Sequence, residues 1–316
     1  MVRSGRPLLR APFTERCRVA DGRDSSRQGE RTSNKLTAKR AASERVASAR
    51  AAEAKAVRRR NVLGAGAAVL VVLLLIGGIV FYGLTHKKKT AAANPAVPAS
   101  SAVTSAVSNV AASSLATTPD FSAVAPPGSL SGAPLTANGK PSVLYVGAEW
   151  CPNCGATRWP LAIALSRFGT FTNLQTTYSA ESHIPTLSFH GSNYTSQYID
   201  FNGKESVDQQ NHPLDKLTPA ESQLFTTIGT SGYPFIDFGG KWKQNGTAFD
   251  PAILSGLTPE SVATTMADAS SKPGAAIQGS ADLFTAMICG IDGGKPANVC
   301  TSAGAIAATT ALSAIK

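Results

Sequence analysis

The feature that most constrains the fold of this chain is a pair of cysteines, Cys151 and Cys154, at the junction between a strand pattern and a helix pattern. An apolar run at 143–146 precedes the pair, and apolar residues recur at helical spacing over 161–168 behind it. These two patterns predict a buried strand and an amphipathic helix. The sequence therefore predicts an α/β fold built around a Cys-Pro-Asn-Cys turn.

The position of the pair gives its two thiols different chemistry. Free N–H groups and the dipole at the start of a helix favour an anion, so Cys151 is the predicted thiolate that attacks a disulfide. Cys154, one turn later, is placed to close an internal disulfide and release the partner. Zinc requires four ligands and no second Cys-x-x-Cys is present, and haem attachment requires His where Gly155 stands. We therefore predict no metal and no cofactor, and keep a purely structural disulfide as the alternative.

The segment Ala148–Cys154 resembles thioredoxin, and its Cys-Pro-x-Cys form resembles the extracytoplasmic relatives of that family. The resemblance implies that Cys151 and Cys154 are catalytic. It covers roughly residues 139–316. The whole layout, a basic tail, one apolar run and a Cys-Pro-x-Cys region with a later cysteine pair, is similar to a membrane-anchored thioredoxin-like group described as domain of unknown function 929.

Thioredoxin-like proteins also carry a cis-proline opposite the cysteines, ahead of a β-hairpin. By resemblance this proline is Pro234, which a short apolar run and the two-residue turn Gly239-Gly240 follow. We expect Pro234, its neighbour Tyr233 and the more distant Trp150 to bind substrate.

Two departures from thioredoxin affect proton transfer. The buried acid that thioredoxin carries six residues before its first cysteine is replaced by Tyr145, and the helix proline, Pro160, falls one residue late. Proton transfer then falls to Glu149, to water or to no special group. The alternative for Glu149 is an exposed carboxylate at the rim of the site.

A charge-free apolar run at 62–84 predicts one transmembrane helix, because 23 residues span about 34 Å at 1.5 Å per residue. The first 60 residues hold 17 of the 30 Lys and Arg residues but 6 of the 20 Asp and Glu residues. The basic side of a span stays in the cytoplasm, so the tail at 1–60 is predicted to be cytoplasmic and largely disordered, without a role in binding nucleic acid. The rest of the chain is predicted to lie outside the cell membrane.

Residues 85–138 are rich in Ala, Ser, Thr and Pro, and we interpret them as a disordered linker. The extracytoplasmic domain is predicted at 139–316: a thioredoxin-like central sheet with flanking helices and an insertion at about 185–228. Within that insertion, Thr218 followed by Pro219 predicts the start of a helix.

A second pair, Cys289 and Cys300, encloses a turn rich in Gly and Pro. We predict a structural disulfide that closes this turn. The alternative is a second redox pair that passes electrons to or from Cys151.

These observations lead to one main hypothesis, a membrane-anchored thiol–disulfide oxidoreductase. Its expected partners are exported proteins that contain cysteines and a membrane redox partner. A second hypothesis is a non-catalytic thioredoxin-like binding module with structural disulfides, in which Cys151 would resist alkylation instead of being exposed with a low pKa. A third is a docking protein that acts through the basic tail.

Overall fold

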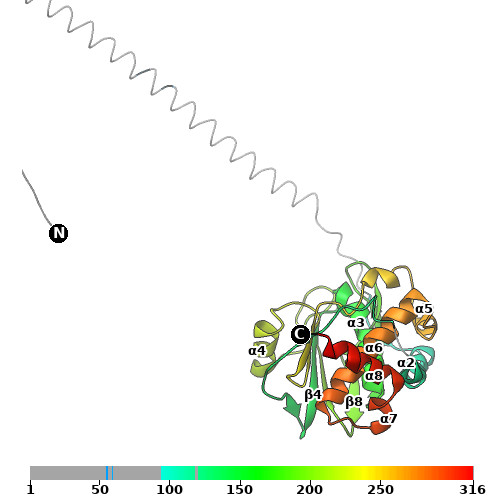
Figure 1. Cartoon of the computed structure of the whole chain (residues 1–316). Helices are drawn as coiled ribbons and strands as arrows, with labels where there is room; N and C mark the ends of the chain where they lie inside the picture. The colour runs from blue at the N-terminus through cyan, green and yellow to red at the C-terminus, as the bar shows by residue number, and fades with distance from the viewer. Residues whose placement is uncertain (1–54, 56–58, 60–93, 118–119, 316) are drawn as a thin grey trace, which may run out of the picture. The chain divides into compact units, whose positions relative to one another are not determined.

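The structure is a computed structural model of the 316-residue chain, and it describes residues 55, 59, 94–117 and 120–315. The described residues from 94 onward belong to one compact unit, Lys88–Lys316 (Figure 1). The tail at 1–60, apart from two single residues, and the apolar run at 62–84 lie outside the described residues. Their predicted roles stay predictions.

The unit is built around a six-stranded sheet in the order β2-β11-β10-β4-β3, with β9 also paired to β4. The strands are β2 Gly128–Ser129, β3 Thr136–Ala137, β4 Lys140–Gly147, β9 Asp200–Glu205, β10 Phe235–Phe238 and β11 Trp242–Asn245. β9 runs parallel to β4, whereas β10 runs antiparallel to both β4 and β11. The predicted α/β class is confirmed.

Two smaller sheets and seven α-helices complete the described part of the chain. The smaller sheets are β1 Val97–Pro98, β6 Gln175–Tyr178 and β7 Pro185–Ser188, and β5 Gly169–Thr172 with β8 Asn193–Ser196. The helices are α2 Ser101–Ser113, α3 Pro152–Ser166, α4 Pro219–Thr227, α5 Pro259–Thr265, α6 Lys272–Ile291, α7 Ala297–Cys300 and α8 Ala303–Ser313, with short 3-10 turns η1 Ser114–Ala116 and η2 Pro251–Leu254.

Alternation along β4 divides the core between the two faces of the sheet. Val143 and Tyr145 pack into the large core that contains α3 and α6, while Leu144 and Val146 pack into a smaller cluster with Phe225 of α4. Side chains of a strand point alternately to opposite faces, so α3 and α6 cover one face and α4 covers the other. β4 is therefore a central strand that is buried on both faces, and the cysteine turn follows its carboxyl end.

The predicted linker at 85–138 is wrong for most of its length. Helix α2 begins at the N-cap Ser100, and its Val103, Val107 and Val110 are 0–2% exposed within the main core. These valines recur at helical spacing, but among Ala and Ser they are too few to produce a strong amphipathic signal. The folded unit therefore starts well before residue 139.

The predicted insertion at 185–228 is also corrected. Strand β9 lies inside that range, yet it pairs with β4 from Asp200 to Glu205 and belongs to the main sheet. Helix α4, which does start after Thr218 with Pro219 in its first turn and a capping box, covers the face opposite α3. Among the strands after β4, those outside the main sheet are β5 to β8, over 169–196.

Helix α6 is long and apolar enough to cross a membrane, the one described helix of which this holds. However, 78% of its apolar window is buried inside the folded unit. Its apolar residues pack against other elements of the main core, so its composition is explained by burial.

Candidate active site

The Cys-Pro-Asn-Cys turn lies where β4 ends and α3 begins. Cys151 is the N-cap of α3, and its Sγ accepts a hydrogen bond from the N–H of Cys154 at 3.2 Å. Pro152 occupies the first turn, where its missing N–H has no intrahelical partner to lose. The sequence thus places the sulfur of Cys151 on the free N–H groups of a helix start.

The antiparallel pairing of β10 with β4 brings Pro234 to the same place. Phe235 pairs with Val146, so the preceding residues of that strand lie beside the carboxyl end of β4. The Tyr233–Pro234 bond is cis, the isomer that the resemblance implies, and the Tyr233 carbonyl oxygen lies 3.9 Å from Cys151 Sγ. The structure therefore brings together cysteines and a proline that are 80 residues apart in the sequence.

Two aromatic side chains cover the thiols. Trp150 and Tyr233 pack against the cluster that contains Cys151 and Cys154, and their rings meet edge to face at 5.9 Å. Cys151 is only 3% exposed and Cys154 is fully buried. The expectation that a catalytic Cys151 is exposed is therefore wrong for this structure. The buried Nε1 of Trp150 has no hydrogen-bond partner among the described residues.

The two thiols differ in acidity. Hydrogen bonds from the Cys154 thiol and from the N–H groups of Cys154 and Asn153, together with the charge of Arg158, lower the pKa of Cys151, although burial opposes them. Burial is the main cause that raises the pKa of Cys154 well above its ordinary value, and its hydrogen bond to Cys151 adds to this. Cys151 is therefore the thiol that ionises first, with Cys154 holding its proton beside it.

A buried ion pair that the sequence alone did not predict lies close to the cysteines. Arg158 of α3 donates from Nε to Glu205 Oε1 at 2.7 Å and from Nη2 to Oε2 at 2.6 Å. Both side chains have no exposed surface. Burial raises the pKa of Glu205, and the charge of Arg158 opposes that rise. The available signal was an arginine four residues after Cys154 on an otherwise apolar helix.

This pair acts on the site through both charge and position. Arg158 Nη2 also donates to the Ala148 carbonyl at 3.0 Å, and so fixes the backbone between β4 and Cys151. The positive charge lowers the pKa of both thiols, and the negative charge of Glu205 raises that of Cys154. Glu205, from β9, is thus a buried carboxylate whose charge acts on the pKa of the second cysteine.

The other residues considered for proton transfer are placed differently. Glu149 is 6% exposed and accepts a hydrogen bond from Ser188 Oγ at 2.6 Å, so neither an exposed rim position nor a free carboxylate describes it. Tyr145 is fully buried with a hydroxyl that has no partner among the described residues, and burial raises its pKa well above the ordinary value.

Two loops beside the site contain consecutive residues with left-handed backbone. Ser182 and His183 have φ of 61° and 49° in a loop whose Glu181 N–H donates to the Trp150 carbonyl. Thr230, with φ of 53°, and the next residue, also left-handed, precede the Tyr233–Pro234 bond. Such conformations cost of order 1–3 kcal/mol per residue and cluster at functional sites.

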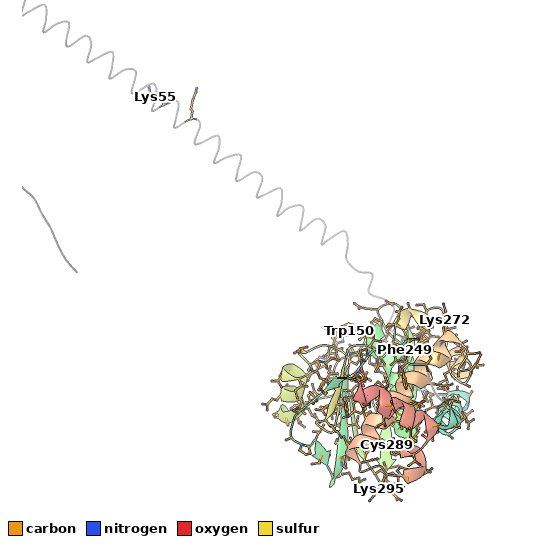
Figure 2. All side chains as sticks on the ribbon, in the orientation of Figure 1. Lys55, Trp150, Phe249, Lys272, Cys289 and Lys295 are labelled. Carbon is orange, nitrogen blue, oxygen red and sulfur yellow. A yellow bond between two sulfur atoms is a disulfide. The ribbon has the colours of Figure 1, made fainter. Side chains whose placement is uncertain are left out.

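Cys289 and Cys300 form a disulfide at the other end of the sheet. Ile291, two residues after Cys289, lies against Gly239 of the hairpin, whose N–H donates to Ser142 near the start of β4. The five residues from Ser142 to the end of β4 span about 16 Å, so the segment that follows Cys289 contacts the end of β4 opposite to Cys151. Figure 2 shows Trp150 and Cys289 toward opposite ends of the unit. Direct thiol exchange between the pairs is incompatible with this geometry, which argues against the electron relay.

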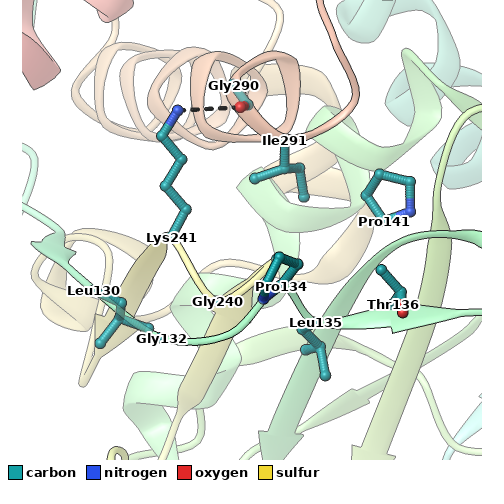
Figure 3. A pocket seen from close by; sticks show the side chains of 11 residues that line it. Leu130, Gly132, Pro134, Leu135, Thr136, Pro141, Gly240, Lys241, Gly290 and Ile291 are labelled. Carbon is teal, nitrogen blue, oxygen red and sulfur yellow. Dashed lines mark hydrogen bonds between the residues drawn. The ribbon is translucent and has the colours of Figure 1, made fainter.

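A surface recess lies at that same far end, between the hairpin and the end of α6 (Figure 3). Pro134, Pro141 and Ile291 are among its apolar lining residues. Its charged lining residue, Lys241, donates to the Gly290 carbonyl at 3.2 Å. None of the residues that line this recess carries a thiol.

Within the part of the chain that the structure describes, no three His, Cys, Asp or Glu side chains gather to hold a metal ion. A family model described as a domain of unknown function, number 929, matches residues 127–290. This match runs from the edge strand β2 to the last turn of α6, and so includes both cysteines of the site and Pro234. Comparisons with curated proteins and with solved structures found no match.

Proposed function

The chain belongs to the family described as domain of unknown function 929, and from the geometry of its site we propose that it is a membrane-anchored thiol–disulfide oxidoreductase. The observation that carries this proposal is the asymmetry of the two thiols. Cys151 caps a helix and has a lowered pKa, while the adjacent Cys154 is fully buried with a raised pKa. A structural disulfide needs no such difference.

The fold assignment that goes with this proposal is thioredoxin-like. Strand β4, helix α3 and strand β9 form a parallel β-α-β unit, and β10 and β11 follow as an antiparallel hairpin. Strands β5 to β8, over 169–196, are then additions between α3 and β9.

The proposed reaction moves two electrons and two protons between dithiol and disulfide. The Cys151 thiolate attacks a substrate disulfide, which releases one substrate thiolate and forms a mixed disulfide. Cys154 then loses its proton and attacks the Cys151 sulfur, so that the second substrate thiolate leaves and the Cys151–Cys154 disulfide forms. The reverse sequence oxidises a substrate dithiol. Substrate backbone docks beside the Tyr233 carbonyl and Pro234, with Trp150 along the same side.

One observation favours the alternative, a non-catalytic binding module. Cys151 is 3% exposed, so a substrate reaches its sulfur only when side chains packed around it, which include Trp150, Val207 and Tyr233, move. A module with a permanent Cys151–Cys154 disulfide would need no such movement, and fold alone does not imply activity.

The test uses the purified full-length chain in detergent, with a peptide disulfide as substrate. We expect Cys151→Ser to abolish exchange, and Cys154→Ser to accumulate a mixed disulfide that a reductant releases. Cys17→Ser, in the predicted cytoplasmic tail, is the matched control and keeps wild-type turnover. Equal inactivity of the wild type and all three variants would favour the binding module.

A further inference from the structure

The hydroxyl of Tyr233 is anchored to the end of strand β4 through Ser206. The Tyr233 hydroxyl oxygen lies 2.7 Å from Ser206 Oγ, and Ser206 Oγ donates to the Gly147 carbonyl oxygen at 3.0 Å. A serine hydroxyl has a single hydrogen, and a carbonyl oxygen only accepts. Because Ser206 gives its hydrogen to Gly147, the Tyr233 hydroxyl is the donor to Ser206. The hydrogen bonds therefore run from Tyr233 to Ser206 and on to Gly147.

Ser206 itself is held by the main chain. Its N–H donates to the same Gly147 carbonyl at 2.9 Å, and its own carbonyl accepts from the Leu214 N–H at 3.0 Å. Gly147 is the last residue of β4, and Ser206 directly follows the last residue of β9, which pairs with β4. Ser206 is thus a fixed acceptor at the end of the sheet where the cysteine turn lies.

Tyr233 is held in place mainly through its side chain. In the described part of the chain, neither its N–H nor its carbonyl oxygen pairs with another backbone group. Its ring is partly exposed, stacks on Phe225 at 5.1 Å and meets Trp150 edge to face at 5.9 Å. Ring stacking permits sliding, whereas a hydrogen bond of 2.7 Å fixes a direction and a distance. The bond to Ser206 therefore determines where the ring lies.

The other side chains around the first cysteine belong to residues whose backbone is hydrogen-bonded. The Trp150 carbonyl accepts from the Glu181 N–H at 3.0 Å, and the Val207 carbonyl accepts from the Glu149 N–H at 3.0 Å. Trp150 is also bonded directly to that cysteine in the chain. Tyr233, which lacks such a backbone hydrogen bond, is the residue of this group that moves away with the least disruption of the fold.

We propose that Ser206 is a positioning residue that holds the Tyr233 ring over Cys151, and that release of their hydrogen bond opens the sulfur to a substrate disulfide. The second part rests on the proposed function. With the bond formed, Cys151 is 3% exposed. One neutral hydrogen bond shifts such an opening equilibrium by a factor of about 2 to 10. Ser206 thus controls access to the thiol without contacting it.

The experiment measures access to Cys151 directly. The full-length chain with Cys17→Ser is purified in detergent, its Cys151–Cys154 pair is reduced, and mass spectrometry of peptides follows alkylation of Cys151 by iodoacetamide. We expect Tyr233→Phe and Ser206→Ala each to raise the alkylation rate about 2- to 10-fold on the high-pH plateau. The pH midpoint stays in place, because neither side chain is among the main causes of the lowered pKa of Cys151.

Two controls identify the hydrogen bond as the cause. The double variant Tyr233→Phe with Ser206→Ala is expected to react no faster than the singles, because both changes remove the same bond. Tyr194→Phe removes a hydroxyl that donates to the Leu165 carbonyl at 2.9 Å, three turns along α3, and is expected to keep the wild-type rate. An unchanged rate in either single variant, multiplied rates in the double, or an equal rise in Tyr194→Phe overturns the inference.

Exchange with a peptide disulfide separates this inference from the proposed function. Failure of the wild type to exchange overturns the proposed function, while the alkylation rates still test whether Ser206 controls access to Cys151. Where the wild type exchanges, Ser206→Ala is expected to raise kcat/KM by the factor seen in alkylation. An unchanged or lower kcat/KM in Ser206→Ala overturns the role of this opening in the reaction.

Discussion

Replacing Arg158 by Met tests how the buried ion pair supports the site. Both partners have no exposed surface, and two hydrogen bonds of 2.7 and 2.6 Å join them. Removing one partner leaves the other charge buried and unpaired, which costs about 3–5 kcal/mol. We expect this loss in Arg158→Met and, separately, in Glu205→Leu.

The double variant gives the contrasting result. Replacing both members of a buried pair by apolar residues is often neutral or stabilising, because the cost of burying two charges disappears with them. Here the Ala148 carbonyl also loses its hydrogen bond from Arg158, which costs about 1 kcal/mol. We therefore expect the free energy of unfolding of the double variant to lie within about 2 kcal/mol of the wild-type value. Its loss of stability should be far smaller than the losses of the two single variants added together.

Thermal unfolding followed by circular dichroism measures these differences. The unit Lys88–Lys316 has an unfolding entropy of about 0.5 kcal/mol per kelvin at the usual value per residue, so each single variant loses about 6–10 °C in Tm. Singles that lose under 2 °C, or a double variant as unstable as the two singles added, would refute the argument that both charges are buried and paired.

The same variants also report on the thiol. Because the charge of Arg158 lowers the pKa of Cys151, Arg158→Met moves the midpoint of Cys151 alkylation to higher pH. A merely structural pair would change Tm and leave this midpoint in place, so an unchanged midpoint would refute the electrostatic role.

Three further predictions concern the site, the disulfide and helix α2. The Cys151 thiolate is expected to persist below the usual thiol pKa of about 8.5 and to disappear as the pH falls through the lowered pKa. Cys154→Ala removes the hydrogen bond that is the largest cause of the lowered Cys151 pKa, so the pH midpoint of Cys151 alkylation should rise. An unchanged midpoint in this variant contradicts the prediction. Cys289→Ser with Cys300→Ser opens a loop of sequence separation 11 and costs about 3 kcal/mol, while exchange in detergent continues; complete loss of exchange by folded protein would revive the relay. Val107→Ala, at a 2% exposed position, is expected to lower the free energy of unfolding by about 2 kcal/mol, measured by chemical denaturation. An unchanged free energy of unfolding would contradict the packing of α2 into the core.

Much of the site was predictable because its signals are local. The cysteine turn sits between a buried strand and a helix start, and Pro152 and the N-cap position follow directly from the order of residues. The helix α4, with its cap at Thr218, was predictable for the same reason. In each case the deciding contacts are within four residues, so spacing along the chain is enough.

The sequence-based predictions were wrong where the structure of a segment depends on packing against residues far away in the chain. Val103, Val107 and Val110 are buried because α2 packs against α3 and α5, and three valines within a run of Ala and Ser do not predict that packing. Likewise β9 joins the main sheet by pairing with β4, and nothing in its own polar sequence distinguishes it from an addition.

The sequence by itself determined the chemistry available to this protein, a thiol at a helix start with a second thiol one turn later. The tertiary structure alone decided what surrounds those thiols. Burial of Arg158 against Glu205 depends on a strand 47 residues away, and the Asn94 N–H donates a hydrogen bond to Gln209, 115 residues away. Side-chain charge is a property of the residue, but its desolvation and its partners exist only once distant segments pack together.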